Sequence, residues 1–220
     1  MKTALVAGAT GLIGKQCMYK LLENANYEKV IVLVRRKFEI KHPKLEQLIV
    51  DYDNLENLTI TDKIDDVFCC LGTTMKKAGS KEAFKKVDYD YVLKLAEFGL
   101  SKGAKKFLLI SANGADPNAA IYYSKVKGEV ENAVKSLSYE TIFIFRPSIL
   151  VGNREEFRLG ERLGISLALL LSPIMLGVLR KYRPIHGAVV ANAMIKKAQS
   201  AEKGNIVLES DKIQELGATN

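Results

Sequence analysis

A tyrosine and a lysine four residues apart are the most chemically suggestive pair in this sequence. Residues 122–127 read YYSKVK, so Tyr123 and Lys127 have the spacing that places two side chains on one face of a helix. Tyr122 has no lysine four residues later, which singles out Tyr123. Upstream, Ser111 directly follows an apolar run, residues 106–110, that is typical of a buried strand.

These residue types suit the reduction of a carbonyl group, which needs a proton donor at the oxygen while hydride reaches the carbon. A free tyrosine has a pKa of about 10, but a neighbouring ammonium favours the phenolate and lowers that pKa. Lys127 would therefore tune Tyr123 and also hold a cofactor ribose, and Ser111 would hydrogen-bond the substrate oxygen as charge develops. The alternative is a solvated helix face without chemistry.

A glycine loop near the start of the chain indicates a dinucleotide site. Residues 8–14 read GATGLIG, between an apolar run and a helical pattern. Gly8 allows a tight turn, Gly11 lets the backbone approach a pyrophosphate, and Gly14 lets the helix pack on the strand. The N–H groups of the first helical turn then bind phosphate. The predicted ligands are Gly8, Thr10, Gly11, Leu12, Ile13 and Gly14. The alternative is that the glycines serve packing only.

The residues that follow the second predicted strand indicate which dinucleotide is bound. Where NAD-binding proteins commonly carry an acid, about 20 residues beyond the loop, this chain has Arg35 and Arg36. A guanidinium can bind a 2′-phosphate with two hydrogen bonds. We therefore expect NADP(H) in preference to NAD(H), with an ordinary solvated basic turn as the alternative.

The elements that must position these residues alternate along the chain. Apolar runs predict strands at 3–7, 30–34, 48–50, 66–71, 106–110, 141–145 and 205–208, and helical periodicity predicts helices at 12–24, 81–102 and 122–137. This alternation predicts an α/β doubly wound parallel sheet, the Rossmann fold, with a small C-terminal helical substrate lobe. Without a linker or repeat, residues 1–220 are expected to form one domain.

Composition limits the other classes of partner. The 220 residues are 48% hydrophobic and carry a net charge of +8, but the basic pairs are scattered among acids and no zinc-finger spacing occurs, so we expect no nucleic-acid binding. The cysteines, Cys17, Cys69 and Cys70, lack metal-ligand spacing. We expect no metal, and reduced thiols in a cytoplasmic protein.

An uncharged stretch, residues 163–179, stands out late in the chain. Its 17 residues lie at the short edge of what can span a membrane, and Pro173 and Gly177 interrupt it. We expect a buried helix pair or a lid over an apolar pocket, and no integral membrane span. Membrane-surface contact or a dimer face is the alternative.

The glycine loop, Ser111 and the pair of Tyr123 and Lys127 resemble the short-chain dehydrogenase/reductase superfamily in its atypical branch. Further motifs, among them CLGTT at 70–74, KAG at 77–79, VKGEVE at 126–131, RPS at 146–148 and YRPIH at 182–186, are similar to the Tat-interactive-protein group and its bacterial relatives. The resemblance covers nearly the whole chain and implies a Rossmann fold that binds NADP(H).

The resemblance also implies further cofactor contacts. Asp51 would face the adenine, Leu71, Gly72 and Thr73 would border the adenosine half, and Arg146, Pro147, Ser148 and Ile149 would lie at the nicotinamide end. Two departures stand out. Thr73 and Thr74 replace the usual alanine and glycine, and Asp88 replaces an asparagine that helps a proton relay in many members.

The leading interpretation is an NADP(H)-dependent oxidoreductase that acts on a small carbonyl or alcohol through Ser111, Tyr123 and Lys127. A second interpretation is a regulatory or scaffold protein that binds NADP(H) without turnover and acts through a protein partner or as a homodimer. A third is an epimerase-type enzyme that keeps its cofactor bound.

Overall fold

A single parallel sheet organises the chain. The computed structural model describes residues 1–152 and 177–218. Seven strands pair in parallel in the order β3-β2-β1-β4-β5-β6-β9. They are β1 (Lys2–Ala7), β2 (Tyr27–Val34), β3 (Leu45–Ile49), β4 (Asp66–Cys69), β5 (Lys106–Ile110), β6 (Thr141–Arg146) and β9 (Gly204–Glu209). The strand order reverses between β1 and β4, which confirms the predicted doubly wound Rossmann fold.

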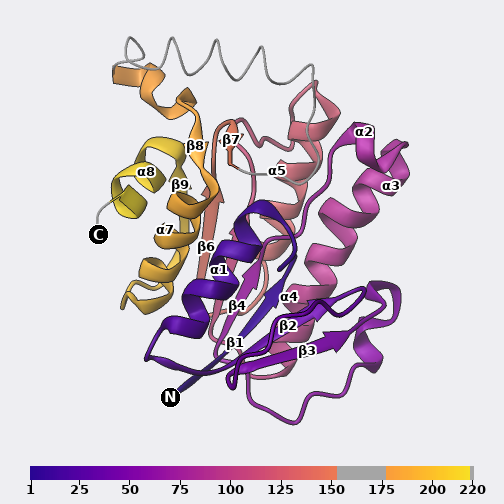
Figure 1. Cartoon of the computed structure of the whole chain (residues 1–220). Coiled ribbons are helices and arrows are strands. Elements are labelled where there is room, and N and C mark those ends of the chain that lie inside the picture. The colour runs from indigo at the N-terminus through magenta and orange to yellow at the C-terminus, as the bar shows by residue number, and fades with distance from the viewer. Residues whose placement is uncertain (153–176, 219–220) are drawn as a thin grey trace.

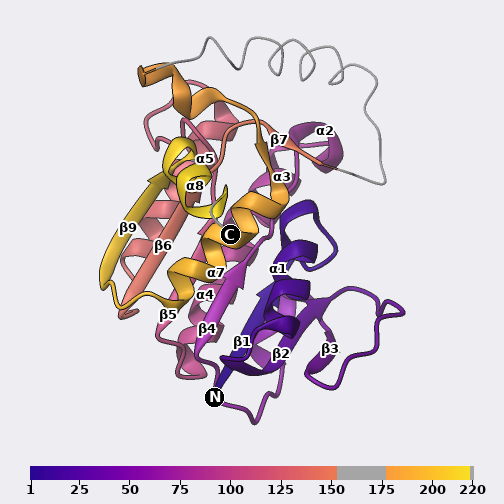
Figure 2. The ribbon, with the colours of Figure 1, turned by 60° about the vertical axis from the view of Figure 1, so that its left-hand side comes forward.

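Helices cover both faces of this sheet (Figures 1 and 2). On one face, α1 (Leu12–Glu23), α7 (Gly187–Gln199) and α8 (Ser210–Ala218) share a core with one set of strand side chains. On the other, α4 (Tyr91–Ser101), α5 (Tyr122–Lys135) and the 3₁₀ turn η1 (Tyr52–Asn57) share a second core. The central strands are buried on both faces, which explains why they read as continuous apolar runs rather than as alternating patterns.

Several predicted elements differ in their bounds. The second strand, predicted at 30–34, begins at Tyr27, and the fourth, predicted at 66–71, ends at Cys69. The third strand was predicted at 48–50 but runs from Leu45 to Ile49. The prediction missed its start because β3 is an edge strand, and its glutamate and glutamine interrupt the apolar run. Gln47 uses its side chain to bond the backbone of Phe38 in the preceding loop. The helix predicted at 81–102 is α3 (Lys81–Lys85), a π-helical turn η2 (Lys86–Asp90) and then α4. The short helix α2 (Met75–Ala78), capped by Thr74, was not predicted.

A small second sheet lies against the glycine loop. It pairs β7 (Leu150–Val151) with β8 (Ile185–His186) in parallel, and the 3₁₀ turn η4 (Gly177–Tyr182) precedes β8. A Cβ added at Gly152 or Gly187 would come within 2.7 Å or 2.9 Å of side-chain carbons of Leu12, so both glycines make room for the first residue of α1. These contacts place the ends of β7 and β8 beside the glycine loop.

The predicted apolar segment 163–179 lies outside the described residues as far as residue 176, and its last three residues begin η4. Across residues 1–152 and 177–218, no helix combines the length and the apolar character that crossing a membrane requires.

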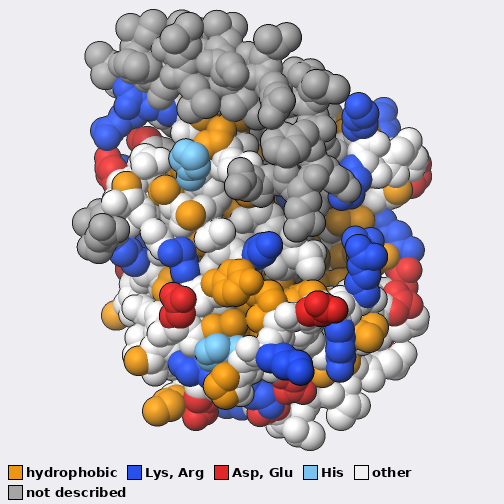
Figure 3. All heavy atoms as spheres, viewed as in Figure 1, with side chains coloured by type: hydrophobic (Ala, Val, Ile, Leu, Met, Phe, Trp, Pro, Cys, Tyr) orange, Lys and Arg blue, Asp and Glu red, His pale blue; other side chains and the backbone are white. Residues whose placement is uncertain are grey.

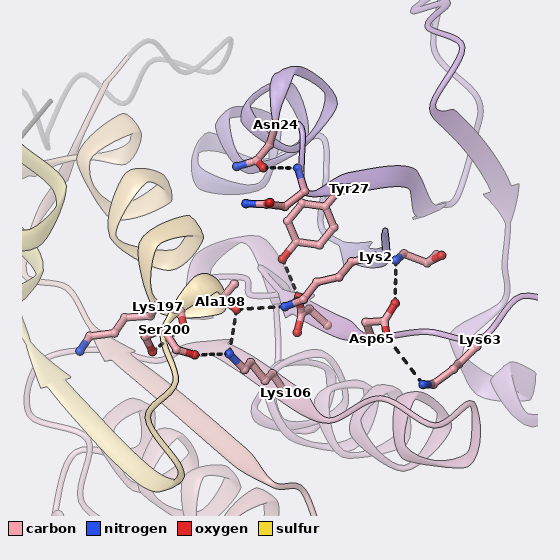
Figure 4. A network of polar contacts seen from close by, with 12 residues as sticks. Lys2, Asn24, Tyr27, Lys63, Asp65, Lys106, Lys197, Ala198 and Ser200 are labelled. Atoms are coloured by element: carbon pink, nitrogen blue, oxygen red, sulfur yellow. Dashed lines mark hydrogen bonds and ion pairs between the residues drawn. The ribbon is translucent and has the colours of Figure 1, made fainter.

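A polar network joins the amino ends of the strands to the end of α7 (Figure 4). The buried Asp66 carboxylate accepts from the Tyr27 hydroxyl at 2.6 Å and from Lys2 Nζ at 2.9 Å. Lys106 Nζ donates to the Ala198 carbonyl at 2.8 Å, where α7 leaves its last carbonyls without helical partners. These contacts stabilise the end of the sheet opposite the glycine loop.

Candidate functional site

The glycine loop has the geometry that the sequence predicted. Gly8 has a φ of +82°, and a Cβ there would lie 2.3 Å from the Cys70 carbonyl oxygen. A Cβ at Gly14 would lie 2.1 Å from the Gly8 carbonyl oxygen, so α1 approaches the loop as closely as backbone allows. At Gly11, by contrast, the nearest atom would be 3.3 Å away and the residue is exposed. Gly8 and Gly14 therefore have no room for a side chain, whereas a Cβ at Gly11 would make one tight contact, with the Gly8 carbonyl oxygen.

The start of α1 offers an anion-binding end. The helix begins at Leu12 with Gly11 as its N-cap, and its first turn holds no acidic residue. Its first N–H groups have no helical acceptor, and the helix dipole adds partial positive charge there. The exposed Thr10 stands beside this turn. The loop is therefore suited to a phosphate group.

Residues predicted around an adenosine follow neighbouring strands at the same edge of the sheet. Arg35 and Arg36 are exposed directly after β2, and within residues 1–152 and 177–218 neither forms an ion pair. Asp51, exposed after β3, caps η1 by accepting from the Asp53 N–H at 3.0 Å. That bond, with one from Asn54, lowers the pKa of the Asp51 carboxyl. Leu71, Gly72 and Thr73 follow β4.

The helix α5 brings Tyr123 and Lys127 together as the spacing predicted. The Tyr123 ring is partly exposed and packs on the Phe84 ring at a centroid distance of 5.5 Å. Lys127 is buried, and its Nζ lies 2.8 Å from Asp88 Oδ1. Burial alone would lower the pKa of the Lys127 ammonium. Attraction to Asp88, and to a smaller extent to Tyr123, outweighs burial and raises that pKa overall. Lys127 is therefore a cation at neutral pH.

Asp88 was marked in the sequence only as a departure from the asparagine of related proteins. In the structure it is fully buried on the π-helical turn η2, and its Oδ2 accepts from the Thr73 N–H at 2.8 Å. A π-helical turn often marks a functional position in a helix. The signal that could have identified this pair is the demand of a buried lysine for a carboxylate partner.

Ser111 lies at the end of β5 as expected, but its hydroxyl is already engaged. The side chain is buried and donates to Glu131 Oε1 at 2.5 Å. The predicted role as oxygen anchor requires that proton to be donated to a substrate, so the observed arrangement gives Ser111 a different partner. Glu131 lies on α5 one turn beyond Lys127 and is 1% exposed.

The predicted nicotinamide-end residues belong largely to the same network. Arg146, at the end of β6, binds Glu131 through Nε at 2.9 Å and Nη2 at 2.6 Å, and reaches Glu209 at 3.1 Å. The hydrogen bonds to Glu131 raise the pKa of the guanidinium. Ser148 accepts from the Ser210 hydroxyl at 3.0 Å and donates to the Arg183 carbonyl. Pro147 is buried, and only Ile149 is exposed.

Sequence reasoning missed Glu131 and Glu209. The available signal was a glutamate on the apolar face of α5, in register with Lys127 and Val134. Among the residues that the structure describes, no three histidine, cysteine or acidic side chains lie close enough together to hold a metal ion.

A doubly wound parallel sheet, a glycine loop at the reversal of strand order and a Tyr–Lys helix beside it define a dinucleotide-binding α/β protein. The chain belongs to the NAD dependent epimerase/dehydratase family, which matches residues 4–156. An NAD(P) nucleotide is the typical cofactor of this family. This confirms the prediction that the chain binds a nicotinamide dinucleotide.

Two relatives support the resemblance that the sequence motifs indicated. HTATIP2 from Rattus norvegicus is 40% identical over 164 residues, which cover 73% of this chain and 67% of that protein. The mitochondrial protein FMP52 from Eremothecium gossypii is 32% identical over 218 residues, covering 97% and 96%.

Solved structures agree on the fold. MoeE5 in complex with UDP-glucose and NAD has a TM-score of 0.69 at 16% identity, covering 98% of this chain and 81% of that one. A UDP-glucose 4-epimerase from Thermotoga maritima has a TM-score of 0.68 at 18% identity, with the same coverage. At these identities the comparison supports the fold alone.

Proposed function

We propose that this protein is an NADP(H)-dependent oxidoreductase of the short-chain dehydrogenase type, acting on a small carbonyl or alcohol. The observation that carries the proposal is that Lys127 lies one helical turn after Tyr123 and against the backbone that follows β4. A Cβ added at Gly72 would lie 3.8 Å from Lys127 Nζ and 3.5 Å from Asp88 Oδ1, so the backbone after β4 lies directly on the buried pair. One lysine can therefore serve both a tyrosine and a ligand bound along that backbone.

The residues present fit the cofactor. The α1 end, with Gly8, Thr10, Gly11, Leu12, Ile13 and Gly14, would hold the pyrophosphate, since Gly11 is exposed and no acid lies in the first turn. Arg35 and Arg36 would hold a 2′-phosphate, which NAD(H) lacks, because their guanidinium groups are exposed. Asp51 would meet the adenine, and Leu71, Gly72 and Thr73 the adenosine half. When bound, the nicotinamide supplies or accepts hydride.

The chain's own residues would manage the proton. Tyr123 gives its hydroxyl proton to the substrate oxygen as the carbon receives hydride, and Lys127 stabilises the phenolate that remains. We assign Ser111 first to the network of Glu131 and Arg146. It anchors a substrate oxygen only if its hydroxyl turns away from Glu131. Arg146, Pro147, Ser148 and Ile149 then shape the nicotinamide end.

A small anionic molecule suits the surface better than a polymer does. Figure 3 shows Lys and Arg side chains spread over one face, with Asp and Glu between them, rather than gathered into one basic patch. A distributed positive charge raises the local concentration of small anions such as a dinucleotide. A cytoplasmic location is part of this proposal, although several relatives are named as mitochondrial proteins.

The test is consumption of NADPH by the purified chain against a panel of aldehydes, ketones and sugar nucleotides. Catalysed oxidation of NADPH with at least one carbonyl supports the proposal. Tight NADPH binding without turnover across the panel favours the regulatory alternative and contradicts the proposal. Cofactor that stays bound through purification, with no net oxidation of added NADPH, favours an epimerase-type enzyme and contradicts it as well.

A further inference from the structure

The Asp88 carboxylate makes two buried contacts, an ion pair through Oδ1 and a hydrogen bond through Oδ2. Oδ1 lies 2.8 Å from Lys127 Nζ, and Oδ2 accepts from the Thr73 N–H at 2.8 Å. Side-chain exposure is 4% for Lys127 and 0% for Asp88, so water replaces neither contact. The aspartate thus ties the lysine of α5 to the backbone that follows β4.

An asparagine cannot make the same two contacts. Its amide has one oxygen and one NH₂ group, so satisfying Lys127 would turn the NH₂ toward the Thr73 N–H, donor against donor. The reverse orientation would set the NH₂ against a buried ammonium. Aspartate is therefore more than a substitute for the asparagine of related proteins. It also places a full negative charge beside Lys127.

We propose that Asp88 is a positioning residue that competes with Tyr123 for the charge of Lys127. The idea rests on the proposed function. A cation that faces a tyrosine alone favours the phenolate, the form that removes a proton from an alcohol. A cation already paired with a carboxylate favours the phenolate less.

Three titratable groups face the Lys127 ammonium within residues 1–152 and 177–218: Asp88 from η2, Tyr123 from α5 and Cys69 from β4. Burial raises the pKa of the Cys69 thiol to about 12, so it is neutral at the pH of interest. Asp88 is then the one anion that divides the charge of Lys127 with Tyr123.

The experiment follows the ionisation of Tyr123 in the whole chain, without substrate. Protein labelled with ¹³C at tyrosine Cζ is titrated by NMR, and Tyr123→Phe identifies the resonance among nine tyrosines. Asp88→Asn should lower the midpoint of Tyr123 by about 1–3 pH units, the usual effect of an uncompensated neighbouring charge. Asp90→Asn, which removes an exposed acid from the same turn, should leave the midpoint unchanged.

A folded Asp88→Asn variant with the midpoint of the wild type would overturn the inference. If that variant does not fold, Asp88→Asn combined with Lys127→Met removes both charges and leaves none buried. Its Tyr123 midpoint should rise by less than about one unit, because a lysine paired with a carboxylate stabilises the phenolate only weakly. A rise of about one unit or more would show that Lys127 acts as a free cation, and would contradict the inference. Neither readout depends on turnover, so a failure of this inference can be told apart from a failure of the proposed function.

Discussion

The Ser111 hydroxyl donates a 2.5 Å hydrogen bond to Glu131, a carboxylate that also holds Arg146 with two bonds. This relationship joins the end of β5 to α5 and to the end of β6. Ser111, which the sequence predicted to bind a substrate oxygen, is therefore part of a buried ionic network. Stability and turnover measurements can separate the two roles.

Ser111→Ala should lower the free energy of unfolding by about 1.5–3 kcal/mol, the usual contribution of a hydrogen bond to a charged group. Glu131→Gln should lower the free energy of unfolding by about 3 kcal/mol, because it removes the main counter-charge of Arg146. Arg146 still pairs with Glu209 in this variant. Urea unfolding measures both, with the exposed Ser138→Ala as the control. A Ser111→Ala variant of wild-type stability that loses turnover would instead return Ser111 to the role of oxygen anchor.

The two glycines Gly11 and Gly14 should respond differently to alanine. Gly14→Ala places a methyl group 2.1 Å from the Gly8 carbonyl oxygen, so we expect a loss of about 1–3 kcal/mol or more in stability. Gly11→Ala should cost less than about 1 kcal/mol, because its methyl group would meet one atom closely, the Gly8 carbonyl oxygen at 3.3 Å. It should still weaken NADPH binding, because residue 11 is the exposed N-cap of the helix end proposed to hold the phosphates. Thermal unfolding and calorimetry test this pair. Equal effects on stability would refute the division between packing and binding.

Arg35→Ala should weaken NADPH binding by about 10- to 150-fold and leave NADH binding nearly unchanged, since only NADPH carries a 2′-phosphate. The wild-type preference should shrink as salt rises, because the guanidinium is exposed and the contact is screened. Calorimetry with both cofactors measures this, and Lys41→Ala, at an exposed lysine in the loop between β2 and β3, controls for net charge. Equal losses for the two cofactors would show that Arg35 does not read the phosphate.

Stability should fall at alkaline pH in part through Cys69. Burial raises the pKa of its thiol from 9.0 to about 12 in the folded chain. The contribution is therefore complete below about pH 9 and is lost as pH rises toward 12, because the unfolded chain releases the proton first. In Cys69→Ala the decline above pH 9 should be shallower by up to about 1.4 kcal/mol per pH unit. Val67→Ala, on the same strand without a titratable group, should keep the wild-type slope.

The sequence predicted the central fold well because buried parallel strands leave an unmistakable pattern. Runs such as the one ending at Ala7 are apolar on both faces, and the glycine loop that follows allows few other structures. The edge strand β3 was displaced in the prediction because an edge tolerates polar side chains. The π-helical turn was invisible, since periodicity alone does not distinguish it from a continuous helix.

The candidate site was predictable where the residues lie near one another in sequence. Tyr123 and Lys127 are one helical turn apart, so spacing alone places them together. The partners Asp88 and Glu131 could not be assigned, because their contacts join elements far apart in the chain. Asp88 is 39 positions from Lys127, and Glu131 is 20 from Ser111. Only the fold brings such carboxylates to their cations.

The central claim is that Tyr123 transfers the proton in an NADP(H)-dependent reaction, and its neighbour offers a matched control. Tyr122 differs by one position on the same helix, and its hydroxyl donates to the Lys81 carbonyl at 3.2 Å. The measurement is kcat for NADPH oxidation with the best carbonyl of the panel, in Tyr123→Phe and Tyr122→Phe. We predict a loss of about 10²–10⁴-fold for Tyr123→Phe, with NADPH affinity kept, and nearly wild-type turnover for Tyr122→Phe. Wild-type turnover by Tyr123→Phe would contradict the account.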